Sequence, residues 1–161
     1  MPAEAWVQWL AAAESAPKVK INEEINYMLY RADALGYETS ADLSGHIDYD
    51  PNQRNQGSCG NCWVWAGTGV MEIAHDVDDG VFDRLSIQFL DSCKTDNFAC
   101  CGGNLGAFAT WYSGQAIAVP WANTNASFAD GARNCASGTL VTCGSISTTP
   151  HYPLNSITAV G

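Results

Sequence analysis

The sequence has few positive charges and no long hydrophobic run. Its 161 residues include 7 Lys and Arg against 17 Asp and Glu, for a formal net charge of -10. Binding to nucleic-acid phosphates needs clustered Lys and Arg, so the composition argues against nucleic acid and equally against an anionic membrane surface. No apolar run approaches the ~18 residues that a membrane span requires. We therefore expect neither nucleic acid nor a membrane among the partners.

Charged residues of both signs are scarce, at 15%, whereas apolar residues make up 47%. That balance is unlike the highly charged composition of a disordered chain. The length is sufficient for one domain with a core and hardly for two. Residues 1–45 show helical patterning, which predicts helices at 6–13 and 22–35.

The middle of the chain contains three further predicted helices. The first begins at residue 62 and closes between residues 75 and 80. A short helix over 86–91 begins at a Ser86 cap, and another over 105–113 is broken by Gly114. Beyond residue 115 small polar residues dominate, and only weak strand signals occur, at 139–142 and 145–149.

The cysteine count is the most informative feature of the composition. There are seven, so at least one is unpaired if the others form disulfides. An exposed thiol in an oxidising compartment is a liability unless the protein uses it. The question is therefore which cysteine is free: Cys59, Cys62, Cys93, Cys100, Cys101, Cys135 or Cys143.

The segment 56–63, QGSCGNCW, has the chemistry of a nucleophilic site. At the first turn of a buried helix, Cys62 has unpaired backbone N–H groups and the positive end of the helix dipole beside its sulfur, and both favour the thiolate. Gln56 can bring its side-chain amide to the same point. An amide donor and the nucleophile's own N–H together form an oxyanion hole.

This segment resembles the active-site signature of papain-like cysteine peptidases, the papain and cathepsin family. The resemblance continues in SIQFLDSC over 86–93 and in CCGG over 100–103. It implies thiol-dependent hydrolysis of peptide bonds in a peptide or protein substrate, with Cys62 as nucleophile and Gln56 in the oxyanion hole. It implies no cofactor and no metal.

The same resemblance implies further roles for other residues. Gly102 and Gly103 would present backbone to an extended substrate, Leu105 would line a specificity pocket, and Trp63 would shape the site. Cys62 would be the free thiol, in an extracellular, periplasmic or lysosome-like oxidising compartment. The family pattern pairs Cys59 with Cys100 and Cys93 with Cys135, which by elimination leaves Cys101 with Cys143.

The resemblance implies an α+β fold, the mostly helical left-hand domain of papain-like enzymes, disulfide-stapled and with long irregular loops. We interpret residues 46–161 as this half-domain and residues 1–45 as an N-terminal extension or short pro-like segment. The family also needs a His and an Asn from a β-rich half, and the contexts of His46, His75 and His151 fit that role poorly. We therefore expect that half to be absent here and to come from a second chain or a C-terminal segment.

Two alternatives to a peptidase remain at this point. The half-domain could bind an extended peptide or a protein through Gly102 and Gly103 without catalysis. Alternatively, four thiolates could hold a structural zinc ion, although two adjacent cysteines have poor spacing for chelation. The zinc ligands would be Cys59, Cys62, Cys100 and Cys101.

Overall fold

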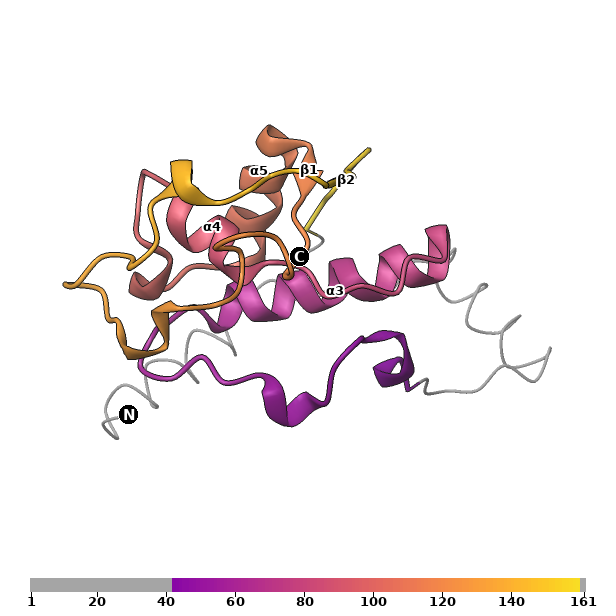
Figure 1. Cartoon of the computed structure of the whole chain (residues 1–161), viewed down its shortest axis with the longest axis horizontal. Coiled ribbons are helices and arrows are strands. Elements are labelled where there is room, and N and C mark those ends of the chain that lie inside the picture. Colours follow the sequence, from indigo (N-terminus) through magenta and orange to yellow (C-terminus); the bar gives the residue numbers. More distant parts are fainter. Residues whose placement is uncertain (1–41, 160–161) are drawn as a thin grey trace, which may run out of the picture. The chain divides into compact units, whose positions relative to one another are not determined.

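The computed structural model describes residues 42–159, which fold mainly into helices (Figure 1). The α-helices in this part of the chain are α3 (Cys62–Asp79), α4 (Ile87–Cys93) and α5 (Leu105–Gln115). A small antiparallel sheet pairs β1 (Ile117–Ala118) with β2 (Tyr152–Pro153). The predicted α+β class, mostly helical with long irregular loops, is confirmed. The helices expected at 6–13 and 22–35 lie outside the described residues.

The long helix α3 begins and ends close to where the sequence predicts. It begins at Cys62, directly after Asn61. It ends at Gly80, which adopts a left-handed conformation with φ of 66° and donates its N–H to the Asp76 carbonyl at 3.0 Å. Glycine adopts this conformation without steric cost, which makes it a common helix terminator.

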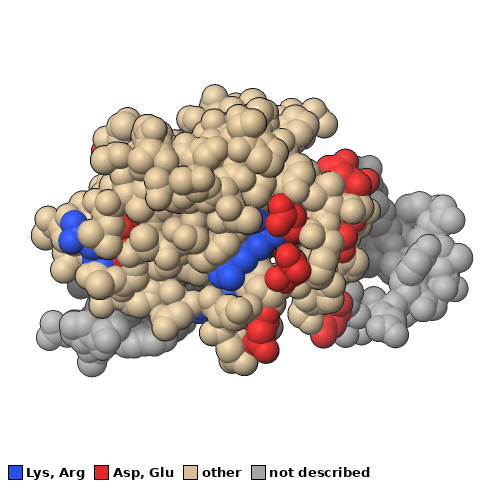
Figure 2. Space-filling model, viewed as in Figure 1, with Lys and Arg blue, Asp and Glu red and all other residues tan. Residues whose placement is uncertain are grey.

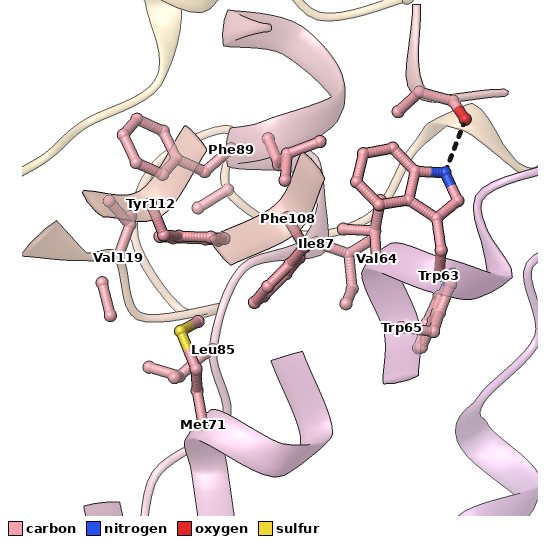
Figure 3. Close-up of a cluster of buried hydrophobic side chains, with 14 of the residues drawn as sticks. Trp63, Val64, Trp65, Met71, Leu85, Ile87, Phe89, Phe108, Tyr112 and Val119 are labelled. Carbon is pink, nitrogen blue, oxygen red and sulfur yellow. Dashed lines mark hydrogen bonds between the residues drawn. The ribbon is translucent and has the colours of Figure 1, made fainter. Parts of the chain in front are cut away.

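One side of α3 packs against α4 and α5 to form the hydrophobic core (Figure 3). At Gly67 the helix has no side chain, and an added β-carbon would lie only 2.7 Å from the Phe108 ring. The Phe108 ring of α5 therefore packs directly on the backbone of α3. Other buried members of this core are Trp63, Val64, Trp65, Met71, Leu85, Ile87, Phe89 and Tyr112.

Helix α4 is anchored by polar side chains at its N-terminal end. Ser86 caps its first turn, because its Oγ accepts the Phe89 N–H at 2.9 Å, as predicted. Gln88 is fully buried and donates its amide to Asp130 at 2.8 Å, while its oxygen accepts the Ala129 N–H at 2.7 Å. The Ser-x-Gln segment thereby ties α4 to the irregular chain around residue 130.

The C-terminal part differs from the sequence prediction in two respects. Gly114 does not break α5, which continues to Gln115 and closes where Ala116, at φ 55°, donates its N–H to Tyr112. The strands expected at 139–142 and 145–149 do not form. In the first segment the buried Asp130 carboxylate accepts the Leu140 N–H at 2.7 Å, so this donor goes to a side chain instead of a strand ladder.

Three disulfides link the described segments, and two of them differ from the family pattern. Cys59 pairs with Cys100, as expected. The other two predicted pairings are wrong: Cys93 joins Cys143, and Cys101 joins Cys135. The physical reason is the path of residues 130–145. The turn at Asn134–Ser137 places Cys135 beside Cys101, and a 3-10 turn at Cys143–Ser145 packs on α4, whose last residue is Cys93.

The charge distribution agrees with the composition. On the face drawn in Figure 2 Lys and Arg atoms form a small strip with acidic groups beside it and a second small group near the left edge, and most of the surface is uncharged. Within residues 42–159, no helix combines the length and the apolar character that crossing a bilayer would require.

Candidate active site

The free thiol lies at the surface, at the first residue of the longest described helix. Cys62 is exposed and is the cysteine that the three disulfides leave unpaired. The residues on both sides of it, Asn61 and Trp63, are buried, at 0% and 6% exposure. The first backbone N–H groups of an α-helix have no partner within the helix. The sulfur is therefore accessible to a reactant while its backbone is fixed by the core.

The loop that precedes Cys62 carries Gln56, and this loop's own backbone holds the Gln56 side chain. Gln56 is half-buried, and its Nε2 donates to the Cys59 carbonyl at 2.8 Å. The Ser58 N–H donates to the Gly131 carbonyl at 2.7 Å, which pins the loop to the rest of the domain. An amide nitrogen carries two hydrogens, so one remains for a second acceptor. Within residues 42–159 the Gln56 amide is thus held by one hydrogen bond, and its second hydrogen has no acceptor.

A glycine pair follows the Cys59–Cys100 disulfide on the chain. Gly102 has a φ of 94°, a conformation that disfavours side chains. Gly103 is exposed and lies against the Trp63 ring, where a β-carbon would come within 2.5 Å of the indole. The Trp63 Nε1 donates to the Ala99 carbonyl at 3.1 Å, which fixes the ring (Figure 3). Leu105, at the start of α5, is 48% exposed.

An apolar groove adjoins this region. Its volume is about 540 Å³, and it runs between α3, α5 and residues 153–159. The apolar side chains along it include Val70, Ala74, Leu105, Ala109, Leu154 and Ile157. The exposed Leu105 thus belongs to the wall of a real depression near the glycine pair.

Two of the three histidines lie near the opposite end of α3 from Cys62. His75 is thirteen residues further along the helix, about 20 Å at 1.5 Å per residue. His46 has its Nδ1 2.7 Å from the Asp76 carboxylate, which is one residue further still. Both imidazoles are therefore far outside hydrogen-bond reach of the Cys62 sulfur.

His151 lies near the same end of the helix. The next residue, Tyr152, packs its ring 5.0 Å from that of His75. The Nδ1 of His151 is 2.9 Å from the Thr148 carbonyl, with which it forms a local turn contact. The three histidines counted in the full sequence are thus all described, and none of them is placed beside the nucleophile.

A buried polar pair behind Cys62 was not foreseen from the sequence. Asn61 donates its Nδ2 to the Asp91 carboxyl at 2.8 Å, and both side chains are essentially inaccessible. Burial raises the pKa of Asp91 to about 7, the charge of Asp130 adds to the rise, and the hydrogen bond from Asn61 opposes it. The sequence signal that could have indicated a buried Asp91 is its position within the largely apolar segment SIQFLDSC.

The zinc hypothesis is wrong for these cysteines. Three of its four ligands, Cys59, Cys100 and Cys101, are consumed by disulfides and offer no thiolate. The described residues contain one cluster of potential metal ligands, formed by Cys59, Asp91 and Cys100, and its two sulfurs are bonded to each other. This cluster leaves one carboxyl, which by itself is no metal site.

The mostly helical, disulfide-linked fold and the free thiol fit the left-hand domain of papain-like enzymes, and the comparison with known proteins agrees. Residues 44–147 match the family described as papain family cysteine protease, and the chain belongs to that family. It is 42% identical to "Probable cysteine protease RDL3" of Arabidopsis thaliana over 55 residues, which are 33% of this chain and 15% of the relative.

Other relatives are similar over short segments of comparable length. Identity is 46% over 50 residues with "Cysteine proteinase 5" of Dictyostelium discoideum, 31% of this chain and 14% of the relative. With "Cathepsin K" of Mus musculus it is 40% over 50 residues, 31% of this chain and 15% of the relative. The chain thus spans less than a fifth of the length of each of these curated relatives.

Proposed function

We propose that Cys62 is the nucleophile of a thiol-dependent peptidase and that this chain supplies the nucleophile-bearing half of its active site. The observation that carries the proposal is the state of the seven cysteines. Six are in disulfides, and the free, exposed one is the first residue of a helix whose start is rigidly packed. A structural thiol would be buried, whereas a nucleophile must be accessible.

The reaction follows from the groups around the sulfur. The Cys62 thiolate attacks a peptide carbonyl carbon, and the C=O electron pair moves to oxygen. The Gln56 amide and the Cys62 N–H stabilise this oxyanion. Collapse expels the amine, which takes up a proton, and leaves a thioester that water later hydrolyses to a carboxylic acid and the free thiol.

The proton for the leaving amine needs a donor that the three placed histidines do not provide. We propose that a His and its orienting Asn come from a second chain or a C-terminal segment that packs beside the thiol. The separation of about 20 Å between Cys62 and His75 supports an external donor.

The substrate in this proposal is an extended peptide that lies along Gly102 and Gly103. The absence of side chains there gives the peptide access to the backbone. Leu105 and the groove beside it would take an apolar side chain of the substrate. The aliphatic part of the groove around Leu105 and Ala109 supports this assignment, whereas its far end along α3 is lined by His75, Asp78 and Asp79.

The three disulfides support an oxidising location, extracellular, periplasmic or lysosome-like, since cytosolic reductants would keep these thiols reduced.

A second candidate function, peptide binding without catalysis through the same glycine pair, is favoured by one observation: the placed histidines are remote from Cys62.

The test measures labelling and turnover separately on the full 161-residue chain. A peptide with a chloromethyl ketone in place of the scissile amide should alkylate Cys62, and Cys62→Ala should abolish the label. Gln56→Ala should slow it, by up to about 10²-fold if the amide stabilises the developing oxyanion fully.

Hydrolysis of a fluorogenic dipeptide amide by the chain alone should be at least about 10²-fold below that of a complete peptidase, because general acid catalysis is missing. Robust turnover that Cys62→Ala abolishes would contradict the need for an external histidine. Labelling no faster than that of a free cysteine peptide would contradict the nucleophile role and favour the binding function.

A further inference from the structure

The buried pair behind Cys62 has two oxygens without a hydrogen-bond partner. Asn61 and Asp91 are joined by one bond, from Nδ2 to Oδ2 at 2.8 Å. The remaining acceptor on each partner, Asn61 Oδ1 and Asp91 Oδ1, is buried and receives no donor from the described residues. Buried acceptors without donors are costly and rare in folded proteins. Two of them on one already bonded pair require a donor that the side chains of the described residues, in this arrangement, do not supply.

A proton on the carboxyl would supply the donor that this pair lacks. If Asp91 Oδ1 carries it, the O–H can donate to Asn61 Oδ1 while Asn61 Nδ2 donates back to Oδ2. We propose that Asp91 is a neutral acid at mildly acidic pH and a positioning residue for Cys62. It closes this acid–amide pair with Asn61 and thereby fixes the residue from which α3 starts. The proposal rests on the assignment of Cys62 as nucleophile.

The surroundings of Asp91 favour the neutral form. Asp130 contributes a negative charge nearby, and Tyr112 on α5 is itself buried, with its pKa raised chiefly by burial. The Cys59 sulfur lies 3.9 Å from Asp91 Oδ2, but it is in a disulfide and carries no proton. Within residues 42–159, none of the groups that act on the carboxyl is cationic.

The position of Asn61 connects this pair to the thiol. The Asn61 carbonyl accepts the N–H groups of Val64 at 2.8 Å and Trp65 at 3.2 Å, which begins the hydrogen-bond ladder of α3. Its side chain does not cap the helix and bonds Asp91 instead. Ionisation of Asp91 would remove the proton that closes the acid–amide pair and place a negative charge beside Asn61, the residue directly before Cys62.

The first measurement is the protonation state of Asp91 itself. In the intact, oxidised chain, the ¹³C shift of the Asp91 carboxyl should titrate near pH 7, about three units above an ordinary aspartate. Assignment by comparison with Asp91→Asn identifies the signal. A titration below pH 5 would overturn the proposal outright.

The second measurement is the rate at which iodoacetamide alkylates Cys62 as a function of pH. The amide in Asp91→Asn can donate to Asn61 and accept from it, so this variant imitates the neutral acid without being able to ionise. It should match the wild type at pH 5.5 and react faster at pH 8, on the order of threefold to tenfold. Asp91→Ala should not reproduce this, because it leaves the Asn61 side chain without a partner.

The matched control is Glu72→Gln, which neutralises another buried carboxyl, in the middle of α3. The oxygens of Glu72 accept hydrogen bonds from the Tyr49 hydroxyl and the Leu85 N–H. The alkylation profile of Glu72→Gln should retain the wild-type shape. Equal rates for the wild type and Asp91→Asn at every pH would overturn the positioning role. Neither measurement needs peptide turnover, so a failure of the peptidase proposal would be seen separately.

Discussion

Gly103 lies against the indole ring of Trp63 so closely that no β-carbon fits between them. A methyl group at residue 103 would come within 2.5 Å of the ring. The ring cannot retreat easily, because it is buried and its Nε1 donates to the Ala99 carbonyl. Trp63, which follows the nucleophile, therefore requires a glycine at position 103 on the proposed substrate face.

A Gly103→Ala substitution should destabilise the fold. Overpacking of this kind costs about 1–3 kcal/mol. Gly114→Ala is a matched control, since this glycine lies in α5 and a β-carbon added there would have nothing within 4 Å. At that position alanine should raise stability by up to about 1 kcal/mol through helix propensity. Urea unfolding of both variants measures the difference, and equal midpoints would contradict the close contact.

The number of free thiols can be counted directly by alkylation. Iodoacetamide should add one group to the native chain, at Cys62, and seven groups after denaturation and reduction. The physical reason is that disulfide sulfurs do not react with the reagent. Intact mass spectrometry reads both numbers, and Cys62→Ser should lower each by one. A native chain that takes up three groups would show that one of the disulfides does not form.

The two disulfides that differ from the family pattern, Cys93–Cys143 and Cys101–Cys135, can be tested by removing one cysteine. Cys135→Ser should liberate Cys101 and leave Cys93 paired with Cys143. Loss of this disulfide should also lower the free energy of unfolding by about 2–4 kcal/mol. Peptide mapping after differential alkylation identifies the freed thiol. Labelling of Cys93 in place of Cys101 would restore the pairing expected from the family pattern.

Stability should depend on pH through Asp91. Its folded-state pKa, about 7, is raised from 3.8, so the folded state binds the proton more tightly. The resulting stabilisation is complete below about pH 4 and is lost as pH rises through 7. Asp91→Asn should therefore be more stable than the wild type at pH 8, on the order of 2–4 kcal/mol, and similar to it near pH 4.

Thermal or urea unfolding at the two pH values measures this dependence. The control is Asp96→Asn, a fully exposed carboxylate beside Lys94, whose loss should change stability little at either pH. If the wild type has a larger free energy of unfolding than Asp91→Asn by the same margin at both pH values, burial does not raise the pKa of Asp91.

Features that depend on neighbouring residues could be predicted from the amino-acid sequence. The end of α3 at Gly80 and the Ser86 cap follow from local signals, because caps and left-handed terminators act within one helical turn. The start of α3 at Cys62 follows from the apolar helical pattern that begins there. The family resemblance was also visible in the local segment around Cys62, and the papain family match confirms it.

The tertiary structure decided what depends on residues far apart in the chain. The partners of Cys93 and Cys101 follow from the path of residues 130–145, which local propensity does not encode. The Leu140 N–H bonds the buried Asp130 carboxylate, so the local strand signal is overridden. The burial of Asp91 against Asn61 likewise arises only when α4 packs behind the start of α3, since thirty residues separate the two side chains.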